Sequence, residues 1–148
     1  MCKRIILFLA AIGLFLEGAR GQQPGRAGIV VLSPDGKVSV SALDKDISIT
    51  DVQTQKKIVS LRGHTAAVTA LAISPDGKLL ASGSMDKTIA LWEMSSGRQL
   101  LRLQGGGLVS SLTFSADGKM LSSRTSDKTL TDWDIATGKK LRQVKEKK

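Results

Sequence analysis

A repeated unit of 41 residues is the feature that most constrains how this chain of 148 residues can fold. The segment Ser-Pro-Asp-Gly-Lys at residues 33–37 recurs at residues 74–78 and, with alanine in place of proline, at residues 115–119. Trp92 recurs as Trp133 with the same spacing of 41 residues. Independent landmarks that keep one period are typical of a chain built from stacked copies of one small unit.

Each copy has the pattern of four short strands joined by turns. In the middle copy the apolar and β-branched runs lie at residues 68–73, 79–83, 88–92 and 99–103. Gly, Pro, Asp or Ser bounds each run, as in antiparallel strands that follow one another through tight turns. Because residues 22–148 show no sustained period of 3.6 residues, no helix is expected there. The sequence predicts an all-β fold in which one copy forms one four-stranded sheet.

The middle copy resembles a WD repeat. The resemblance rests on Gly63-His64, on the Ser-Pro-Asp-Gly turn and on the segments at residues 82–86 and 91–93. It extends over residues 29–144, although each element alone is a weak signal. The resemblance implies a β-propeller, a ring of about four to eight four-stranded sheets called blades. The expected fold is therefore a partial β-propeller of three four-stranded antiparallel blades.

The N-terminus has the pattern of an export signal. Residues 1–4 are basic, residues 5–16 are apolar and residues 19–21 offer a cleavage site with small residues. The apolar run is shorter than the roughly 20 residues that span a bilayer. We therefore expect a signal-peptide helix and an exported protein, periplasmic or extracellular, with an uncleaved membrane anchor as the alternative. The only cysteine, Cys2, lies in this segment, so the mature chain would have no disulfide bond.

The repeat and the export signal together predict the organisation of the chain. We expect a signal peptide at residues 1–21, a linker at 22–28, a degenerate first WD repeat at 29–62, a second repeat at 63–104, a third repeat at 105–144 and a basic tail at 145–148.

The family resemblance implies a buried chain of hydrogen bonds in the middle blade, formed by His64, Ser82, Asp86 and Trp92. Trp brings one N–H donor into the core, Ser accepts it and bonds the imidazole, and Asp accepts from the other imidazole nitrogen. His64, Ser82 and Asp86 are also the residue types of a hydrolytic triad. The structural role is favoured because Ser82 lies within a strand pattern and has Trp92 as a partner.

The other two copies depart from this pattern. The third copy keeps Ser123, Asp127 and Trp133, but three glycines at residues 105–107 stand where Gly-His belongs. The first copy has Thr50-Asp51 in place of Trp-Asp. We therefore expect an incomplete network in the third blade, none in the first, and the greatest stability in the second.

Charge and composition narrow the kinds of partner. The formal net charge is +9, and much of it lies between Lys139 and Lys148. We expect this segment to be a solvated end. If it has a function, that function would be a weak contact with an anionic surface. Nucleic acid is disfavoured because the chain has no Tyr and no aromatic residues beside its basic ones. With one His and no motif for phosphate or metal, no cofactor or metal is expected.

Three blades are fewer than a closed propeller contains. We expect the two end sheets to present apolar faces, which a partner would cover. Three explanations for a chain with only three blades remain open: a homo-oligomer, a separate chain that supplies the missing blades, or a gene fragment.

The expected function is a non-catalytic protein-binding scaffold of an exported WD-repeat protein. Loops at one end of the blades carry the candidate contact residues, which are Thr65, Ala66, Met85, Lys87, Leu108, Arg124 and Lys128. An exported propeller hydrolase is the alternative from another class, and it would need clustered carboxylates such as Asp44, Asp46, Asp86 and Asp127. A non-functional fragment of a longer WD-repeat protein is the third reading.

Overall fold

The computed structural model describes residues 28–147, which contain twelve β-strands and no helix. The all-β fold class expected from the sequence is confirmed. The expected signal peptide, nearly all of the linker and Lys148 lie outside the described residues. The strands are β1 (Ile29–Leu32), β2 (Val38–Leu43), β3 (Asp46–Asp51), β4 (Lys57–Leu61), β5 (Val68–Ile73), β6 (Leu79–Ser84), β7 (Thr88–Glu93), β8 (Gln99–Gln104), β9 (Val109–Phe114), β10 (Met120–Thr125), β11 (Thr129–Asp134) and β12 (Lys140–Lys145).

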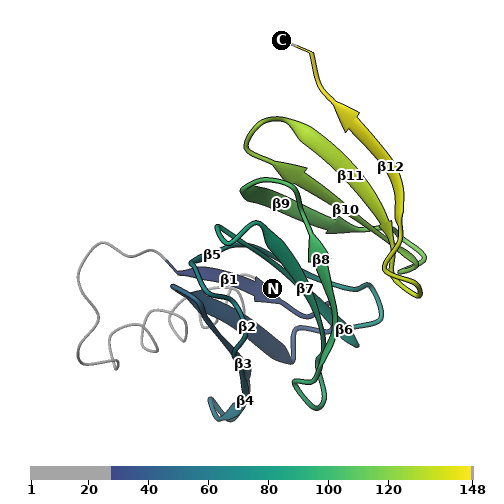
Figure 1. The fold of residues 1–148 in the computed structure, drawn as a ribbon. Coiled ribbons are helices and arrows are strands. Elements are labelled where there is room, and N and C mark those ends of the chain that lie inside the picture. The colour runs from purple at the N-terminus through teal and green to yellow at the C-terminus, as the bar shows by residue number, and fades with distance from the viewer. Residues whose placement is uncertain (1–27, 148) are drawn as a thin grey trace.

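The strands form three four-stranded antiparallel sheets, each from four consecutive strands (Figure 1). Sheet 1 contains β1 to β4, sheet 2 contains β5 to β8, and sheet 3 contains β9 to β12. Every connection within a sheet is a hairpin, so a copy of the sequence repeat needs no strand from elsewhere to complete its hydrogen-bond ladder. This is the three-blade architecture that the repeat predicts.

The Ser-x-Asp-Gly-Lys segments form the same turn three times. In sheet 2, the Ser74 hydroxyl donates to the Asp76 carboxylate (2.5 Å), and the backbone N–H of Lys78 donates to the same oxygen (3.0 Å). These bonds hold the pKa of Asp76 below its usual value. Gly77 has a φ of +72°, which glycine adopts without steric cost. The recurring sequence is therefore a local device that reverses the chain between the first two strands of each sheet.

The basic C-terminal segment is largely a strand. Lys140–Lys145 form β12, which pairs with β11 as the outermost strand of sheet 3. All six residues of β12 are exposed. The segment is solvated as expected, but residues 140–145 are part of the sheet.

The three sheets stack face to face and enclose two apolar cores. Between sheets 1 and 2, Val40 and Ile49 pack with Leu80 and Trp92. Between sheets 2 and 3, the opposite face of sheet 2 supplies its own set of apolar residues. That set is Ala70, Ala81, Ile89, Leu91 and Leu103, packed against Val109, Leu112, Leu121 and Trp133 of sheet 3. Sheet 2 therefore has both faces covered, which explains why five of the six residues of β6 and of β7 are buried.

Glycine at position 83 is required by this stacking. A Cβ atom built on Gly83 would collide with a methyl group of Val109 and lie 2.7 Å from its Cβ. Gly83 thus lets β9 of sheet 3 approach the middle of sheet 2, and the sheets could not close to this distance over a larger residue.

We predict that Gly83→Ala lowers the free energy of unfolding by about 1–3 kcal/mol, because the added methyl overpacks the contact with Val109. Chemical denaturation followed by tryptophan fluorescence measures the change. Arg124 occupies the same register position in sheet 3, 41 residues later. The control Arg124→Ala should have little effect, and equal losses in both variants would contradict the packing argument.

Candidate functional site

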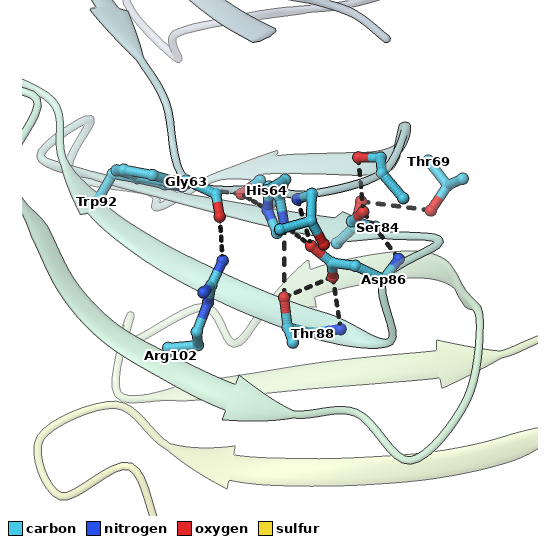
Figure 2. A network of polar contacts seen from close by, with 12 residues as sticks. Gly63, His64, Thr69, Ser84, Asp86, Thr88, Trp92 and Arg102 are labelled. Atoms are coloured by element: carbon cyan, nitrogen blue, oxygen red, sulfur yellow. Dashed lines mark hydrogen bonds and ion pairs between the residues drawn. The ribbon is translucent and has the colours of Figure 1, made fainter. Parts of the chain in front are cut away.

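A continuous chain of hydrogen bonds crosses the middle sheet and ends at its surface loops (Figure 2). Trp92 Nε1 lies 2.8 Å from Ser82 Oγ, and Ser82 Oγ lies 2.7 Å from His64 Nε2. His64 Nδ1 lies 2.9 Å from Asp86 Oδ2. The structure thus brings together the four residues that the sequence singled out in this repeat.

With a neutral imidazole, one arrangement of protons satisfies all three contacts. The Trp92 N–H can only donate, so Ser82 Oγ accepts it and donates its own proton to His64 Nε2. His64 Nδ1 then carries the remaining proton and donates it to the Asp86 carboxylate. Every polar atom of the buried Trp92, Ser82 and His64 side chains is paired, which removes the cost of burying them.

Asp86 connects this buried chain to the loops. Its carboxylate also accepts from the backbone N–H groups of Thr65 (3.0 Å) and Thr88 (2.9 Å) and from the Thr88 hydroxyl (2.6 Å). Burial alone would raise the pKa of Asp86, but the hydrogen bonds from Thr88, His64 and Thr65 lower it far below its usual value of 3.8. The ionised carboxylate therefore fixes the β4–β5 loop against the β6–β7 turn.

Ser82, His64 and Asp86 have the connectivity of a hydrolytic triad but not its accessibility. Ser82 is fully buried, and its oxygen already accepts the Trp92 N–H. A nucleophilic serine must be open to a substrate beside donors that stabilise an oxyanion. The geometry supports a structural role for these three residues.

Sheet 3 keeps part of the network. Trp133 Nε1 donates to Ser123 Oγ (2.9 Å), and Ser123 in turn donates to the backbone carbonyl of Thr131 (3.3 Å). Asp127 bonds to Thr125 and Thr129, and these bonds lower its pKa to about 2. Without a histidine in the β8–β9 loop, no side chain joins the tryptophan to the aspartate.

The described residues of sheet 1 form no such network, but strands β2 and β3 pair in the same register as β6 and β7 of sheet 2. Thr50 pairs with Ser39 as Trp92 pairs with Leu80 in sheet 2, so Thr50 occupies the tryptophan position. The Thr50 hydroxyl is buried and has no hydrogen-bond partner among residues 28–147. Threonine at the tryptophan position therefore places a buried hydroxyl in sheet 1 that no described residue satisfies.

Most of the candidate contact residues lie in loops at one end of the stack. Thr65 and Ala66 are in the β4–β5 loop, and Leu108 is in the β8–β9 loop. The turns that join the second and third strands carry the others. These are Met85 and Lys87 between β6 and β7, and Lys128 between β10 and β11.

Backbone hydrogen bonds join these loops to one another. Met85 N–H donates to Ala67 (2.9 Å), Gly105 N–H donates to Lys87 (2.9 Å), and Ser126 N–H donates to Leu108 (2.8 Å). Lys87 and Lys128 have positive φ values of 67° and 65°, and both side chains are exposed. Four loops of sheets 1 to 3 thus form one continuous end, which we call the loop end.

Arg124 lies on a strand, close to the loop residues. It is the next-to-last residue of β10, and only Thr125 separates it from the β10–β11 turn. Its side chain lies on the face of sheet 3 directed away from sheet 2, where its guanidinium lies 2.6 Å from Glu146, and the Glu146 backbone N–H donates to Lys128 of that turn. Arg124 therefore lies at the loop end of its strand, with its side chain on the outward face of sheet 3.

Two residues outside the predicted set support the site. Thr88 bonds Asp86 twice. The segment Asp-Lys-Thr at residues 86–88 recurs at residues 127–129, and this recurrence is the signal by which the sequence could have identified Thr88. Arg102 of β8 donates to the backbone carbonyl of Gly63, next to His64 (Figure 2). Nothing in the sequence marked Arg102, because its partner is a main-chain atom 39 residues away.

The basic residues of β12 mostly have partners within sheet 3. Lys145 lies 3.4 Å from Asp127, Arg142 lies 3.8 Å from Asp132, and the Lys140 ammonium lies 5.4 Å from the centre of the Trp133 ring. The exposed positive charge of this strand is therefore partly neutralised.

Residues 28–147 contain no group of three or more His, Cys, Asp or Glu placed to hold a metal ion. The same residues contain no helix of the length and hydrophobicity needed to cross a membrane.

Stacked four-stranded meanders with a Trp–Ser–His–Asp chain of hydrogen bonds define a protein of the β-propeller class. Comparison with known families agrees, since residues 55–93 and 97–131 each match the WD domain, G-beta repeat. The chain belongs to the WD40 repeat family.

Similar proteins carry the same repeats. The chain is 36% identical over 66 residues to the small ribosomal subunit protein RACK1y of Oryza sativa subsp. japonica, which covers 45% of this chain and 20% of that protein. It is 39% identical over 66 residues to the guanine nucleotide-binding protein subunit beta of Schizosaccharomyces pombe, which covers 45% of this chain and 22% of that protein. The chain therefore spans about a fifth of the length of these two relatives.

A solved structure shows the same fold. The crystal structure of the RRP9 WD40 repeats superposes with a TM-score of 0.78 at 28% sequence identity. The match covers 84% of this chain and 40% of that one.

The family repeat is offset from the sheets by one strand. The first matched segment runs from β4 through β7, and the second runs from β8 into β11. Each repeat therefore contributes its first strand to the outer edge of one sheet and its next three strands to the following sheet. This offset links neighbouring sheets covalently as well as by packing.

We predict that Ser82→Ala lowers the free energy of unfolding by about 1–3 kcal/mol, because it leaves the buried Trp92 N–H and His64 Nε2 without partners. Equilibrium urea unfolding measures the loss. Ser41 occupies the same register position in sheet 1, where there is no tryptophan. Ser41→Ala should be nearly neutral, and a comparable loss there would show that the network is not the cause.

The lowered pKa of Asp86 predicts an acid dependence of stability. A carboxylate with a depressed pKa contributes stability that is complete well above its usual pKa of 3.8 and is lost as the pH falls through and below that value. Asp86→Asn should be less stable than the wild type at about pH 7, and the difference should shrink between about pH 5 and pH 3. Urea midpoints measured across this range test the prediction, and a difference that does not change with pH would contradict it.

Proposed function

We propose that this chain is a protein-binding scaffold module whose partner docks on the loop end. The observation that carries the proposal is the exposed loop end itself, whose loops are held together by Asp86 and by hydrogen bonds between backbones. Loops that are already ordered lose little conformational entropy when a partner binds. A scaffold with such loops binds without first having to fold them.

The chemistry of the loop end favours a partner with acidic side chains. Lys87 and Lys128 of the loop end are exposed. Lys45 is exposed in the corresponding β2–β3 turn, which lies next to the loop end because the backbone N–H of Val68, the first residue of β5, donates to Asp44 of that turn. Met85 adds an apolar side chain that is 49% exposed. Methionine is enriched at protein interfaces, and a row of lysines steers an oppositely charged surface towards it.

The relatives support a role in assemblies. Two of them are, by name, a protein of the small ribosomal subunit and the β subunit of a guanine nucleotide-binding protein. A non-catalytic role fits these names and the inaccessible Ser82. An exported hydrolase receives no support from the described residues, because the polar atoms of its candidate triad already satisfy one another.

Export is part of the proposal and rests on the sequence of residues 1–21. The scaffold would then act in the periplasm or outside the cell. Fractionation of the native host, with an antibody raised against residues 28–147, tests this part, and recovery of an uncleaved chain in the cytosol would contradict it.

We predict that Lys87→Ala with Lys128→Ala weakens partner capture by about tenfold, because both charges lie on the docking end. Capture from an extract of the native host, quantified by mass spectrometry, measures the binding. Lys78→Ala with Lys119→Ala removes the same charge from turns at the opposite end of the strands and serves as the matched control. Capture that falls equally in both variants would place the docking surface elsewhere.

A further inference from the structure

The face of sheet 3 that is directed away from sheet 2 carries polar residues at positions where sheet 2 is apolar. Positions in the two sheets correspond at a spacing of 41 residues, and their strand pairings follow the same register. Ala70, Ala81, Gly83, Leu91 and Leu101 of sheet 2 face sheet 3. Their counterparts in sheet 3 are Ser111, Ser122, Arg124, Asp132 and Arg142. The other apolar residues of the same face, Leu79, Ile89 and Leu103, correspond to Met120, Leu130 and Val144, so apolar residues remain on the outward face of sheet 3 beside its charged ones.

These polar side chains bond one another across the strands. The Ser122 hydroxyl donates to Asp132 Oδ1 at 2.7 Å, and Arg142 Nε lies 3.8 Å from Asp132 Oδ2. Arg124 pairs with Glu146 at 2.6 Å. The polar groups of this face are therefore already paired, and covering the face would remove water from four charged groups.

The shape of the face also excludes a blade packed in the regular way. Gly83 holds the position in sheet 2 that Arg124 holds in sheet 3. A Cβ atom built on Gly83 would already collide with Val109 of sheet 3. A strand placed against sheet 3 as β9 is placed against sheet 2 would collide with the whole Arg124 side chain.

Sheet 1, at the opposite end of the stack, also has polar residues at positions where sheet 2 is apolar, but none of the three is charged. Sheet 2 presents Leu80, Ala90 and Trp92 to sheet 1. The equivalent positions on the outward face of sheet 1 are Ser39, Ser48 and Thr50, as the strand pairings show. Ser39 and Ser48 are half-buried and Thr50 is buried, so these positions are polar but less open to water than Arg124 and Arg142 on sheet 3.

We infer that the outward face of sheet 3 is an end cap, which remains in water and does not receive a further propeller blade. The inference corrects the expectation of an apolar end face at sheet 3 and argues against ring completion by a second copy or another chain at that face. It does not depend on the proposed function, since a partner on the loop end leaves the cap free.

Cysteine labelling measures directly whether the cap is covered. In the full chain with Cys2→Ser, we compare alkylation of Ser111→Cys with that of Ala70→Cys, its counterpart in sheet 2. Ser111 is exposed and Ala70 is buried. We expect the Ser111→Cys thiol to react at the rate of the unfolded chain and the Ala70→Cys thiol to react at least about tenfold more slowly. Equal protection of both thiols would overturn the inference.

A second variant tests whether polarity is what keeps the face free. Arg124→Gly, Asp132→Leu and Arg142→Leu together rebuild the apolar face of sheet 2 on sheet 3. Sedimentation velocity should show that this variant forms a larger species than the wild type under the same conditions. A well-folded variant that sediments like the wild type would overturn the inference.

The control variant carries Glu93→Leu and Arg98→Leu, which replace an ion pair in the β7–β8 hairpin (4.0 Å) outside the cap. It should sediment like the wild type. If the triple variant fails to fold, the labelling of Ser111→Cys still decides the question.

Discussion

Face-to-face packing of the sheets is the interaction on which the rest of this structure depends. A single four-stranded meander satisfies its own backbone hydrogen bonds, but it cannot bury an apolar face without a neighbour. Sheet 2 has neighbours on both sides, and most residues of β6 and β7 are buried there. Gly83 marks how closely the sheets approach, since no larger residue fits against Val109.

The polar network is a consequence of that packing. Burying Trp92 between sheets 1 and 2 also buries its indole N–H, which Ser82 satisfies. His64 then satisfies Ser82, and Asp86 satisfies His64 at the edge where the loops begin. One chain of bonds thus transmits the order of the core to the surface loops. In sheet 1, where Thr50 replaces the tryptophan, a buried hydroxyl is left without a partner among the described residues.

The same repeat serves different purposes according to its position in the stack. The middle unit is apolar on both faces, whereas the third unit keeps an apolar face towards sheet 2 and carries Arg124 and Asp132 on the other. The loops at one end have no such asymmetry, because a lysine stands in the same turn of every sheet. The stack thus combines a charged outward face on sheet 3 with a lysine that recurs in the same turn of each sheet.

The sequence by itself determined the strands, their turns and the members of the hydrogen-bond network. Those features depend on local chemistry, such as the Ser-x-Asp-Gly-Lys turn, and on a fixed period that places equivalent residues at equivalent sites. Only the tertiary structure decided which face of each strand meets another sheet. Side chains alternate between two faces, and the order of stacking selects the covered one. For this reason the sequence did not predict that the Arg124 side chain lies on the outward face of sheet 3, where those of Asp132 and Arg142 also lie.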